Sequence, residues 1–437
     1  MRIARESKFV RRECRKITPI EFFDLCMFSN PEMKETTLNT LTSTFEMDTE
    51  KYLSNQSLNE RFNERSVEFM RYLLKHFLEE IISEEKNKYS IELECFETVK
   101  IKDSTCFKIS DDLKSIYNSS NKADCKLSII RIQFEYDLKT GQICYIDIQA
   151  SAKQDNTDAQ LTVDNVKEKD LIIRDLGYCV LSVLSKIDEK KSYFLSRFNF
   201  KSIAYETKDS EIGIDFNKII SDLKKNNLQC IEKNVFVGRK ERLPVRLIIE
   251  VLPEIQISNR LQNLRKNAKR KGVKLSKEII SRASLNVYIT NVSQDLLPIN
   301  KVRNLYSLRW QIEIVFKAWK SIGKINSTKK VKIERFETMF YSRLILIIIN
   351  WLLFSQIRNY LYHFEKKYLS VLKSFKIQFE MILDFKIALK QGVSSLSKTI
   401  QKLIDIICKK CIISKKKGVK NSYIIMEMFK NSVKETA

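Results

Sequence analysis

Histidine is nearly absent from this sequence of 437 residues, where only His76 and His363 occur. Both lie in stretches with the apolar period of an amphipathic helix, so we expect them to be structural rather than catalytic. No glycine-rich phosphate loop of the P-loop or dinucleotide-binding kind occurs either. These absences disfavour histidine-based catalysis, histidine-rich metal sites and such nucleotide folds. Any enzyme chemistry is therefore expected to depend on carboxylates.

Glycine, proline and long apolar runs are also scarce. The 8 Gly and 5 Pro residues argue against a linker-rich or disordered protein. The most apolar run, residues 344–354, is only about half as long as the ~20 residues that a membrane span needs. We therefore expect a core helix there and no membrane partner.

The 10 cysteines show no spacing typical of a disulfide framework. Cys408 and Cys411 form one close pair, but a zinc site needs a second pair within reach and none follows. The N-terminal sequence lacks the apolar segment of a secretory signal. Reduced thiols and a cytoplasmic protein are therefore expected.

Positive charge is what the sequence has in excess. Its 78 Lys and Arg residues against 54 Asp and Glu residues give a formal net charge of +24. Such an excess indicates a polyanionic partner, and nucleic acid is the obvious one. An AT-rich coding sequence would also inflate the lysine content, so charge alone leaves both explanations open. The length predicts roughly two to four domains.

The first 95 residues are expected to be mainly helical. Ser54 or Asn55 can cap a helix, and apolar residues then recur with helical period over residues 58–78. Gln56 and Asn59 lie on the first turns of this helix, where their side chains could reach base edges. A helix-turn-helix DNA reader and an ordinary helical bundle fit this pattern equally well.

From about residue 96 the pattern changes to strands. We expect strands at residues 98–102, 129–136, 143–148, 171–173 and 193–195, with a turn at 139–141 and a helix at 180–187. This order predicts a mixed α/β domain. Further strands are expected at 235–237, 245–251 and 285–289, and helices beyond about residue 299. A basic segment at 260–282 fits either a solvated helix face or a surface that binds phosphates.

Two aspartates are placed where metal chemistry is expected. Asp103 lies at the end of the first predicted strand, and Asp175 at the end of a later one, with Gly177 permitting a sharp turn after it. Neighbouring strand ends in one sheet can lie side by side, so both carboxylates could reach one metal ion. Oxygen ligands suit Mg²⁺ or Mn²⁺. Each aspartate could instead be an ordinary loop residue that caps a helix.

A third carboxylate, Glu313, lies in a predicted amphipathic helix. At about 100° per residue, it shares a narrow stripe with Tyr306, Arg309 and Lys320, beside an apolar stripe that faces the core. An acid that binds metal, flanked by bases that bind phosphates, suits an enzyme that cuts DNA. A solvated face with Arg309 and Glu313 paired at i,i+4 is the alternative.

The spacing Tyr-x2-Arg-x3-Glu-x6-Lys, starting at Tyr306, resembles the YREK motif of the insertion-sequence four family of DDE transposases. The letters DST around Asp103 are similar to the first aspartate block of that family. RDLGY around Asp175, followed by YFLSR at 193–197, is similar to the second block. The resemblance extends over about residues 1–335.

This resemblance implies an α/β protein with a ribonuclease-H-like catalytic core, a β-rich insertion, and helical N- and C-terminal regions. The implied domains are a helical DNA-binding domain (1–95), the catalytic core (96–199 and 299–335), the β-rich insertion (200–298) and a helical C-terminal region (336–437).

The resemblance also implies an activity. Asp103, Asp175 and Glu313 would bind two Mg²⁺ (or Mn²⁺) ions for strand cleavage and strand transfer, while Tyr306, Arg309 and Lys320 would hold phosphates. The expected partners are double-stranded DNA with terminal inverted repeats, target DNA and a second copy of the chain. A bacterial, cytoplasmic and nucleoid-associated protein is expected. Some relatives stack a flipped base on a tryptophan of the insertion, but the 3 Trp here lie outside residues 200–298.

Two rival interpretations remain. A decayed transposase could bind DNA without catalysis, although its three acids and the YREK spacing are intact. A ribonuclease-H-like nuclease could cut DNA without joining it.

Overall fold

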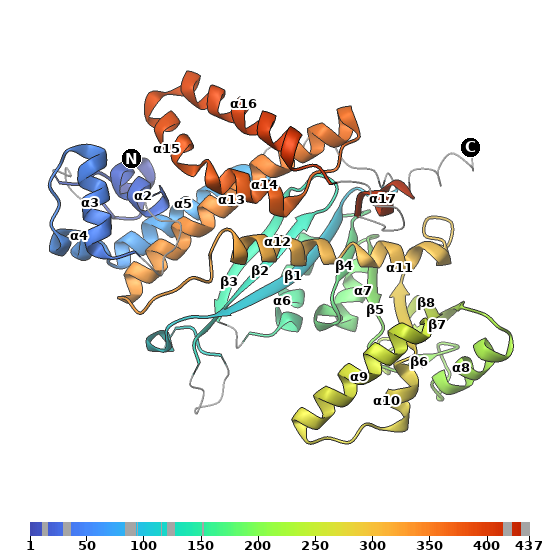
Figure 1. The fold of residues 1–437 in the computed structure, drawn as a ribbon. Coiled ribbons are helices and arrows are strands. Elements are labelled where there is room, and N and C mark those ends of the chain that lie inside the picture. The colour runs from blue at the N-terminus through green and yellow to red at the C-terminus, as the bar shows by residue number, and fades with distance from the viewer. Residues whose placement is uncertain are drawn as a thin grey trace. The chain divides into compact units, whose positions relative to one another are not determined.

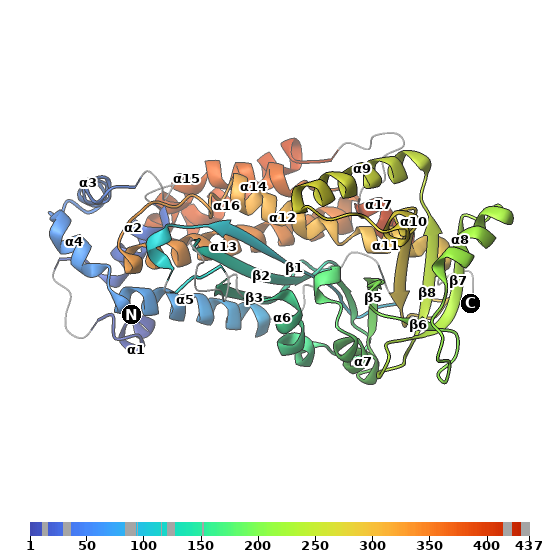
Figure 2. The same cartoon turned by 90° about the horizontal axis from the view of Figure 1, so that it is seen from below.

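The computed structural model describes residues 1–10, 16–28, 36–83, 93, 95–114, 116–119, 127–150, 153–413 and 422–429. The chain forms two compact units, each built from separate segments (Figures 1 and 2). Unit 1 comprises Met1–Ile91, Asp103–Lys153 and Trp310–Tyr423. Unit 2 comprises Glu92–Lys102, Gln154–Arg309 and Ile424–Ala437.

Unit 1 consists of helices and one side of a sheet. Its helices are α1 (Arg2–Glu6), α2 (Pro19–Phe28), α3 (Leu38–Thr49), α4 (Asn55–Arg61), α5 (Glu64–Ser83), α12 (Trp310–Ser321), α13 (Ile333–Glu365), α14 (Val371–Glu380), α15 (Ile382–Gln391) and α16 (Val393–Lys410). A short 3₁₀ turn, η1, covers Asp111–Leu113. Its strands, in the order β3-β2-β1, are β3 (Ile143–Ala150), β2 (Ile129–Asp137) and the second half of β1 (Val99–Lys108).

Helix α13 is the centre of unit 1, with α2, α5 and α14 packed around it. It is long and apolar enough to cross a membrane, but 83% of its most apolar window is buried inside the protein. Polar side chains of α13 donate hydrogen bonds to the turn between β2 and β3. Trp351 Nε1 donates to Gly141 O at 2.8 Å, and Asn359 Nδ2 donates to Thr140 O at 2.7 Å. The burial and these contacts are those of a core helix, as expected.

The turn between β2 and β3 was predicted at residues 139–141 and is confirmed. Gly141 has a positive φ of 77°, a conformation that costs glycine little. A Cβ atom there would lie 2.5 Å from Ser355 Oγ of α13. Glycine is therefore needed both for the backbone and for the close approach of α13.

Unit 2 holds the other side of the sheet, in the order β1-β4-β5-β9-β8-β7-β6. Its own strands are β4 (Leu171–Arg174), β5 (Tyr193–Arg197), β6 (Ala204–Tyr205), β7 (Cys230–Val237), β8 (Leu243–Val251) and β9 (Leu285–Thr290). Its helices are α6 (Asp155–Thr162), α7 (Leu181–Glu189), α8 (Phe216–Lys225), α9 (Glu254–Lys271), α10 (Lys277–Arg282) and α11 (Ile299–Ser307), with 3₁₀ turns η2 (Val163–Asn165) and η3 (Leu176–Tyr178). A last helix, α17 (Ser422–Glu427), crosses the unit boundary.

The strand directions identify the fold class. β1 pairs in parallel with β4, and β4 with β5, whereas β2 and β3 are antiparallel. Helical regions precede and follow these strands in the chain. The predicted mixed α/β fold with a ribonuclease-H-like core is therefore confirmed.

The segment 200–298 contains strands β6 to β9 and helices α8 to α10. Its strands extend the main sheet, because β9 pairs with β5 through Leu195 and Thr290. An apolar core with members such as Phe216, Leu247 and Val287 fills this part of unit 2. The four-part division of the chain into domains stays a prediction.

Three sequence-based expectations about local structure are wrong. The first strand does not end at Asp103 but continues to Lys108, because Thr105 and Phe107 keep the alternation and are buried. The helix expected over residues 55–78 is broken after Arg61, since Asn63 accepts from the backbone N–H groups of Arg65 and Ser66 and so starts α5. The third difference, a break within the YREK segment, belongs to the candidate site.

Candidate active site

Asp175 follows directly after β4, where Arg174 ends the strand and η3 begins. Its side chain keeps 49% of its surface exposed and lies 3.9 Å, Oδ1 to Nε, from Arg309, whose own side chain is only 11% exposed. A half-exposed carboxylate beside a nearly buried guanidinium remains accessible to a ligand. The alternative expectation placed Arg309 on a solvated helix face, paired with Glu313, whereas the Arg309 side chain is nearly buried here.

The YREK segment is not one helix. α11 ends at Ser307 and α12 begins at Trp310, so Arg309 lies in the turn between them. The backbone N–H groups of Leu308 and Arg309 donate to residues three positions earlier, which tightens the last turn of α11. Tyr306 and Arg309 consequently belong to unit 2, and Glu313 and Lys320 to unit 1.

Tyr306 is buried beside Asp175 in unit 2. Burial and then the charge of Asp175 raise the pKa of its phenol to about 12. The phenol is therefore protonated at neutral pH and able to donate a hydrogen bond. Among the described residues its hydroxyl has no hydrogen-bond partner, although it is buried.

Arg197 extends the same group of side chains. It comes from β5, and its guanidinium carbon lies 5.9 Å from the centre of the Tyr306 ring. Its Nη2 donates to Asn286 Oδ1 at 3.1 Å, and Arg260 Nη2 donates to the same oxygen at 2.8 Å. Arg197 closes the YFLSR segment that resembled the family, and Arg260 opens the basic segment 260–282, but neither residue was expected to lie near Tyr306.

In unit 1, Asp103 lies in the middle of β1, and its Oδ1 accepts from the N–H of Ser104 at 2.8 Å. Lys320 of α12 reaches the same strand, donating from Nζ to Cys106 O at 2.9 Å. Burial lowers the pKa of Lys320. Helix α12 and strand β1 run in the same general direction (Figures 1 and 2).

This common direction relates Glu313 to Asp103. Cys106 is three positions after Asp103 on the strand, a rise of about 10 Å. Lys320 is seven positions after Glu313 on the helix, a rise of about 10.5 Å. Because Lys320 contacts Cys106, we expect Glu313 to lie level with Asp103.

Asp103 and Asp175 each follow a residue that takes part in the parallel pairing of β1 with β4. Lys102 of β1 pairs with Arg174 of β4, and each aspartate is the next residue. Within the described ranges, no three His, Cys, Asp or Glu side chains lie close enough together to hold a metal ion. The donor chemistry nevertheless fits Mg²⁺ or Mn²⁺, because all three groups are carboxylates and Asp175 is half-exposed.

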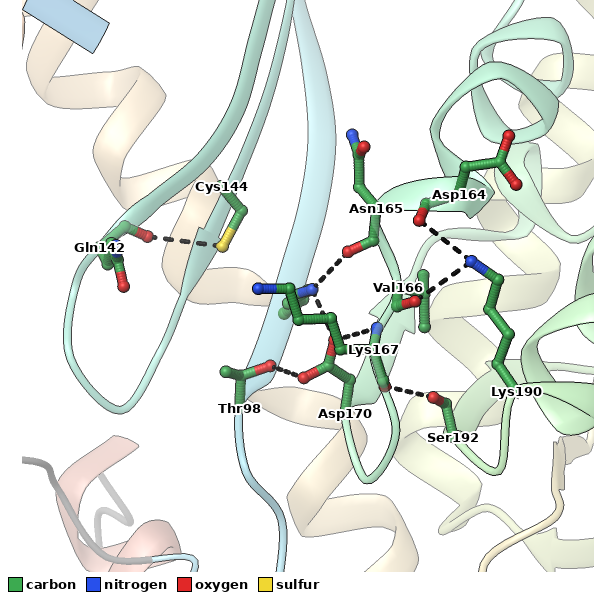
Figure 3. A network of polar contacts seen from close by, with 11 residues as sticks. Thr98, Gln142, Cys144, Asp164, Asn165, Val166, Lys167, Asp170, Lys190 and Ser192 are labelled. Carbon is green, nitrogen blue, oxygen red and sulfur yellow. Dashed lines mark hydrogen bonds and ion pairs between the residues drawn. The ribbon is translucent and has the colours of Figure 1, made fainter. Parts of the chain in front are cut away.

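Two other aspartates near these strands have structural roles. Asp170, just before β4, accepts from Thr98 Oγ1 at 2.5 Å and from the N–H of Lys167 at 2.8 Å (Figure 3). It also pairs with Lys100 at 2.5 Å. This network closes the end of the strands opposite Asp175, so Asp170 cannot serve the same site.

Asp158 of α6 is the second structural aspartate. It forms an ion pair with Lys102, and both side chains are almost completely buried. Lys102 Nζ also donates to Thr162 Oγ1 at 2.8 Å and lies 5.8 Å from the centre of the Tyr178 ring in η3. This buried pair supports the turn that carries Asp175.

Gly177 of η3 has a different role from the one expected. Its φ is not positive, so the turn does not require glycine for its backbone. A Cβ atom at this position would lie 3.3 Å from Asp155 Oδ2 of α6. Glycine therefore allows α6 to pack closely against the turn after Asp175.

Gln56 and Asn59 lie on α4 in unit 1. Ser54 caps this helix, as predicted, by accepting from the N–H of Ser57. Asn55 Oδ1 accepts from Thr42 Oγ1 at 2.9 Å and so ties α4 to α3. The side chains of Gln56 and Asn59 are exposed, and Gln56 Nε2 donates to Glu60 Oε1 at 3.1 Å.

Comparison with known proteins identifies the family of this chain. The model of the transposase DDE domain matches residues 94–351. The transposase for insertion sequence element IS1151 of Clostridium perfringens is 33% identical, over 98% of this chain and 93% of that protein. The transposase for IS231F of Bacillus thuringiensis subsp. israelensis is 32% identical, over 92% of this chain and 86% of that protein. The chain therefore belongs to the DDE transposases, enzymes that cut and join DNA strands, as the YREK spacing predicted.

Proposed function

We propose that this transposase binds the terminal inverted repeats of an insertion sequence and performs strand cleavage and strand transfer by a two-metal mechanism. The observation that carries the proposal is the half-exposed Asp175 at the end of β4, with the buried Tyr306 and Arg309 beside it. Asp103 and Glu313 complete the proposed set of carboxylates.

The proposed roles follow from charge and protonation. Asp103, Asp175 and Glu313 would hold two Mg²⁺ or Mn²⁺ ions. Bound divalent ions supply charge that stabilises the attacking and leaving oxygens of a phosphodiester. Arg309 and Lys320 would bind phosphates beside the scissile bond, and the protonated phenol of Tyr306 would donate a hydrogen bond to one of them.

The remaining parts of the chain have proposed roles as well. Residues 1–95 would recognise the repeat, 96–199 with 299–335 would form the catalytic core, and 200–298 and 336–437 would be the insertion and the C-terminal region. The protein would act as a homodimer on repeat ends and target DNA, in the bacterial cytoplasm and at the nucleoid.

Strand transfer separates this function from that of a simple nuclease. We expect the purified protein, with Mg²⁺, to join a short duplex ending in the repeat to a supercoiled plasmid. Joined products are measured by the label that the plasmid acquires. Nicking of the repeat end without any joining would instead indicate the nuclease interpretation, and binding without cleavage would indicate a decayed enzyme.

End recognition makes a second prediction. Changing Gln56 and Asn59 to Ala should weaken binding to the repeat more than binding to random duplex, because these exposed side chains can reach base edges. We expect about a ten-fold loss, since a good base contact is worth about 1–3 kcal/mol. Gel shift with the full chain measures both affinities.

The matched control for this pair is Gln401 of α16, whose Nε2 makes the same i,i+4 hydrogen bond, to Asp405 Oδ1 at 3.0 Å. Gln401→Ala should leave both affinities unchanged. An equal loss on the repeat and on random duplex in the Gln56 and Asn59 variant would contradict a recognition role for α4.

A further inference from the structure

Helix α9 is an unusual element of unit 2, because none of its 18 residues is buried. It lies on the outside of unit 2 and projects away from the sheet (Figure 1). A helix that buries so little apolar surface gains little from packing. Some other interaction must account for its position and its sequence.

The two faces of α9 differ in composition. Residues such as Ile257, Leu261, Leu264 and Ala268 are partly buried and fall on one face at about 100° per residue. The opposite face is exposed and carries Arg265, Lys266, Lys269 and Arg270, preceded along the helix by polar residues and the exposed Ile255. Glu254 is the one acidic residue of the helix, at its first position.

The four cations of this exposed face are not neutralised by the protein. In the part of the chain that the structure describes, none of them forms an ion pair or a hydrogen bond through its side chain. A basic residue on a helix can pair with an acid at i±3 or i±4, as Arg282 does with Glu278 on α10. Four adjacent unpaired cations attract a polyanion.

The base of α9 is fixed to the candidate site. Arg260 donates to Leu285 O at 2.7 Å and to Asn286 Oδ1 at 2.8 Å, which holds the helix against β9. Arg197 donates to the same Asn286 oxygen and lies over Tyr306, the neighbour of Asp175. Arg303 of α11 adds a hydrogen bond to Gln256 at 3.1 Å. The basic face therefore belongs to an arm anchored beside the site.

We infer that the exposed face of α9 (Arg265, Lys266, Lys269 and Arg270) binds the phosphate backbone of duplex DNA outside the cleaved bond, without reading its sequence. The inference extends the proposed function by naming a surface that holds DNA as it enters the site. Phosphate contacts of this kind release counterions, so their contribution falls steeply with salt.

The test compares two triple variants with the same loss of charge in the same unit. Lys266→Gln, Lys269→Gln and Arg270→Gln remove three cations from α9. Lys218→Gln, Lys224→Gln and Lys225→Gln remove three exposed cations from α8. Affinity of the full chain for duplex DNA is measured by fluorescence anisotropy across a range of salt concentrations, without divalent cations.

The α9 variant should bind about ten-fold more weakly at low salt. Its plot of log affinity against log salt should be shallower by up to about 2.7, because each phosphate contact contributes about 0.9 to the slope. The α8 variant should keep the wild-type slope. A conservative variant, Lys266→Arg, Lys269→Arg and Arg270→Lys, should keep it too. Equal slopes for the α9 and α8 variants would overturn the inference.

Three duplexes distinguish donor DNA from target DNA as the ligand of α9. They are a random sequence, the repeat cut at its end, and the repeat with flanking DNA. A loss confined to the flanked repeat assigns α9 to donor DNA, and a loss on all three assigns it to target DNA as well. Since binding is measured without cleavage, the result does not depend on whether the protein joins strands.

Discussion

Replacing Asp175 with Ala should abolish strand cleavage while leaving binding to repeat DNA intact. Removing one carboxylate from a metal site removes charge stabilisation of the oxyanions that develop as the strand is cut. We expect a loss on the order of 10²–10³ in the cleavage rate, or more, and the same result for Asp103→Ala and Glu313→Ala. Binding rests on many phosphate contacts elsewhere and should not fall. Single-turnover cleavage with Mg²⁺ and gel shift measure the two effects.

Asp147 provides the matched control. It lies on β3, where its Oδ1 accepts from the N–H of Ile148 at 2.9 Å and its Oδ2 accepts from Gln149 Nε2 at 2.5 Å. Asp147→Ala should cleave at nearly the wild-type rate. If Asp103→Ala remains active and Asp147→Ala does not, the first carboxylate of the site has been misassigned.

The second large effect concerns stability. Lys102→Met should lower the free energy of unfolding by about 3–5 kcal/mol, because it leaves the carboxylate of Asp158 buried without its cation. The double variant Lys102→Met with Asp158→Leu should recover most of this loss, since it removes both charges and retains apolar volume. Urea unfolding followed by circular dichroism gives the three values.

The exposed pair of Lys108 and Asp111 serves for comparison, with side chains 58% and 48% exposed. Lys108→Met should cost at most about 1 kcal/mol. A similarly small cost for Lys102→Met would show that Asp158 finds another way to satisfy its charge, and the proposed support for the Asp175 turn would then fail.

Local patterns in the sequence predicted the local structure well. Alternation located β2 and β3, and short apolar runs located β4 and β5. Ser54, one of two residues expected to cap the helix, caps α4. Each of these features depends on neighbours in sequence. The continuation of β1 to Lys108 was also encoded, in the alternation of Thr105 and Phe107 with exposed Cys106. The predicted strand at residues 98–102 was therefore too short.

The break between α11 and α12 could not be predicted in the same way. Leu308 and Arg309 are flanked by no glycine or proline, and the apolar period runs straight through them. The break accompanies the burial of Arg309 beside Asp175, which is 134 residues earlier in the chain. A helical projection uses only the local sequence and takes no account of such a distant contact. It therefore placed Tyr306, Arg309, Glu313 and Lys320 on one stripe, although these residues belong to two helices and the turn between them.

The way the chain is divided between the two units has a consequence for synthesis. Unit 2 draws its main segments from residues up to Arg309, whereas unit 1 needs both the first residues and Trp310–Tyr423. During translation, α2 and α5 leave the ribosome early. They cannot pack against α13 until most of the protein has been made. A product that stops near residue 309 would carry Asp103 and Asp175 but neither Glu313 nor the buried centre of unit 1. If Glu313 has its proposed role, such incomplete chains would be unable to cut DNA.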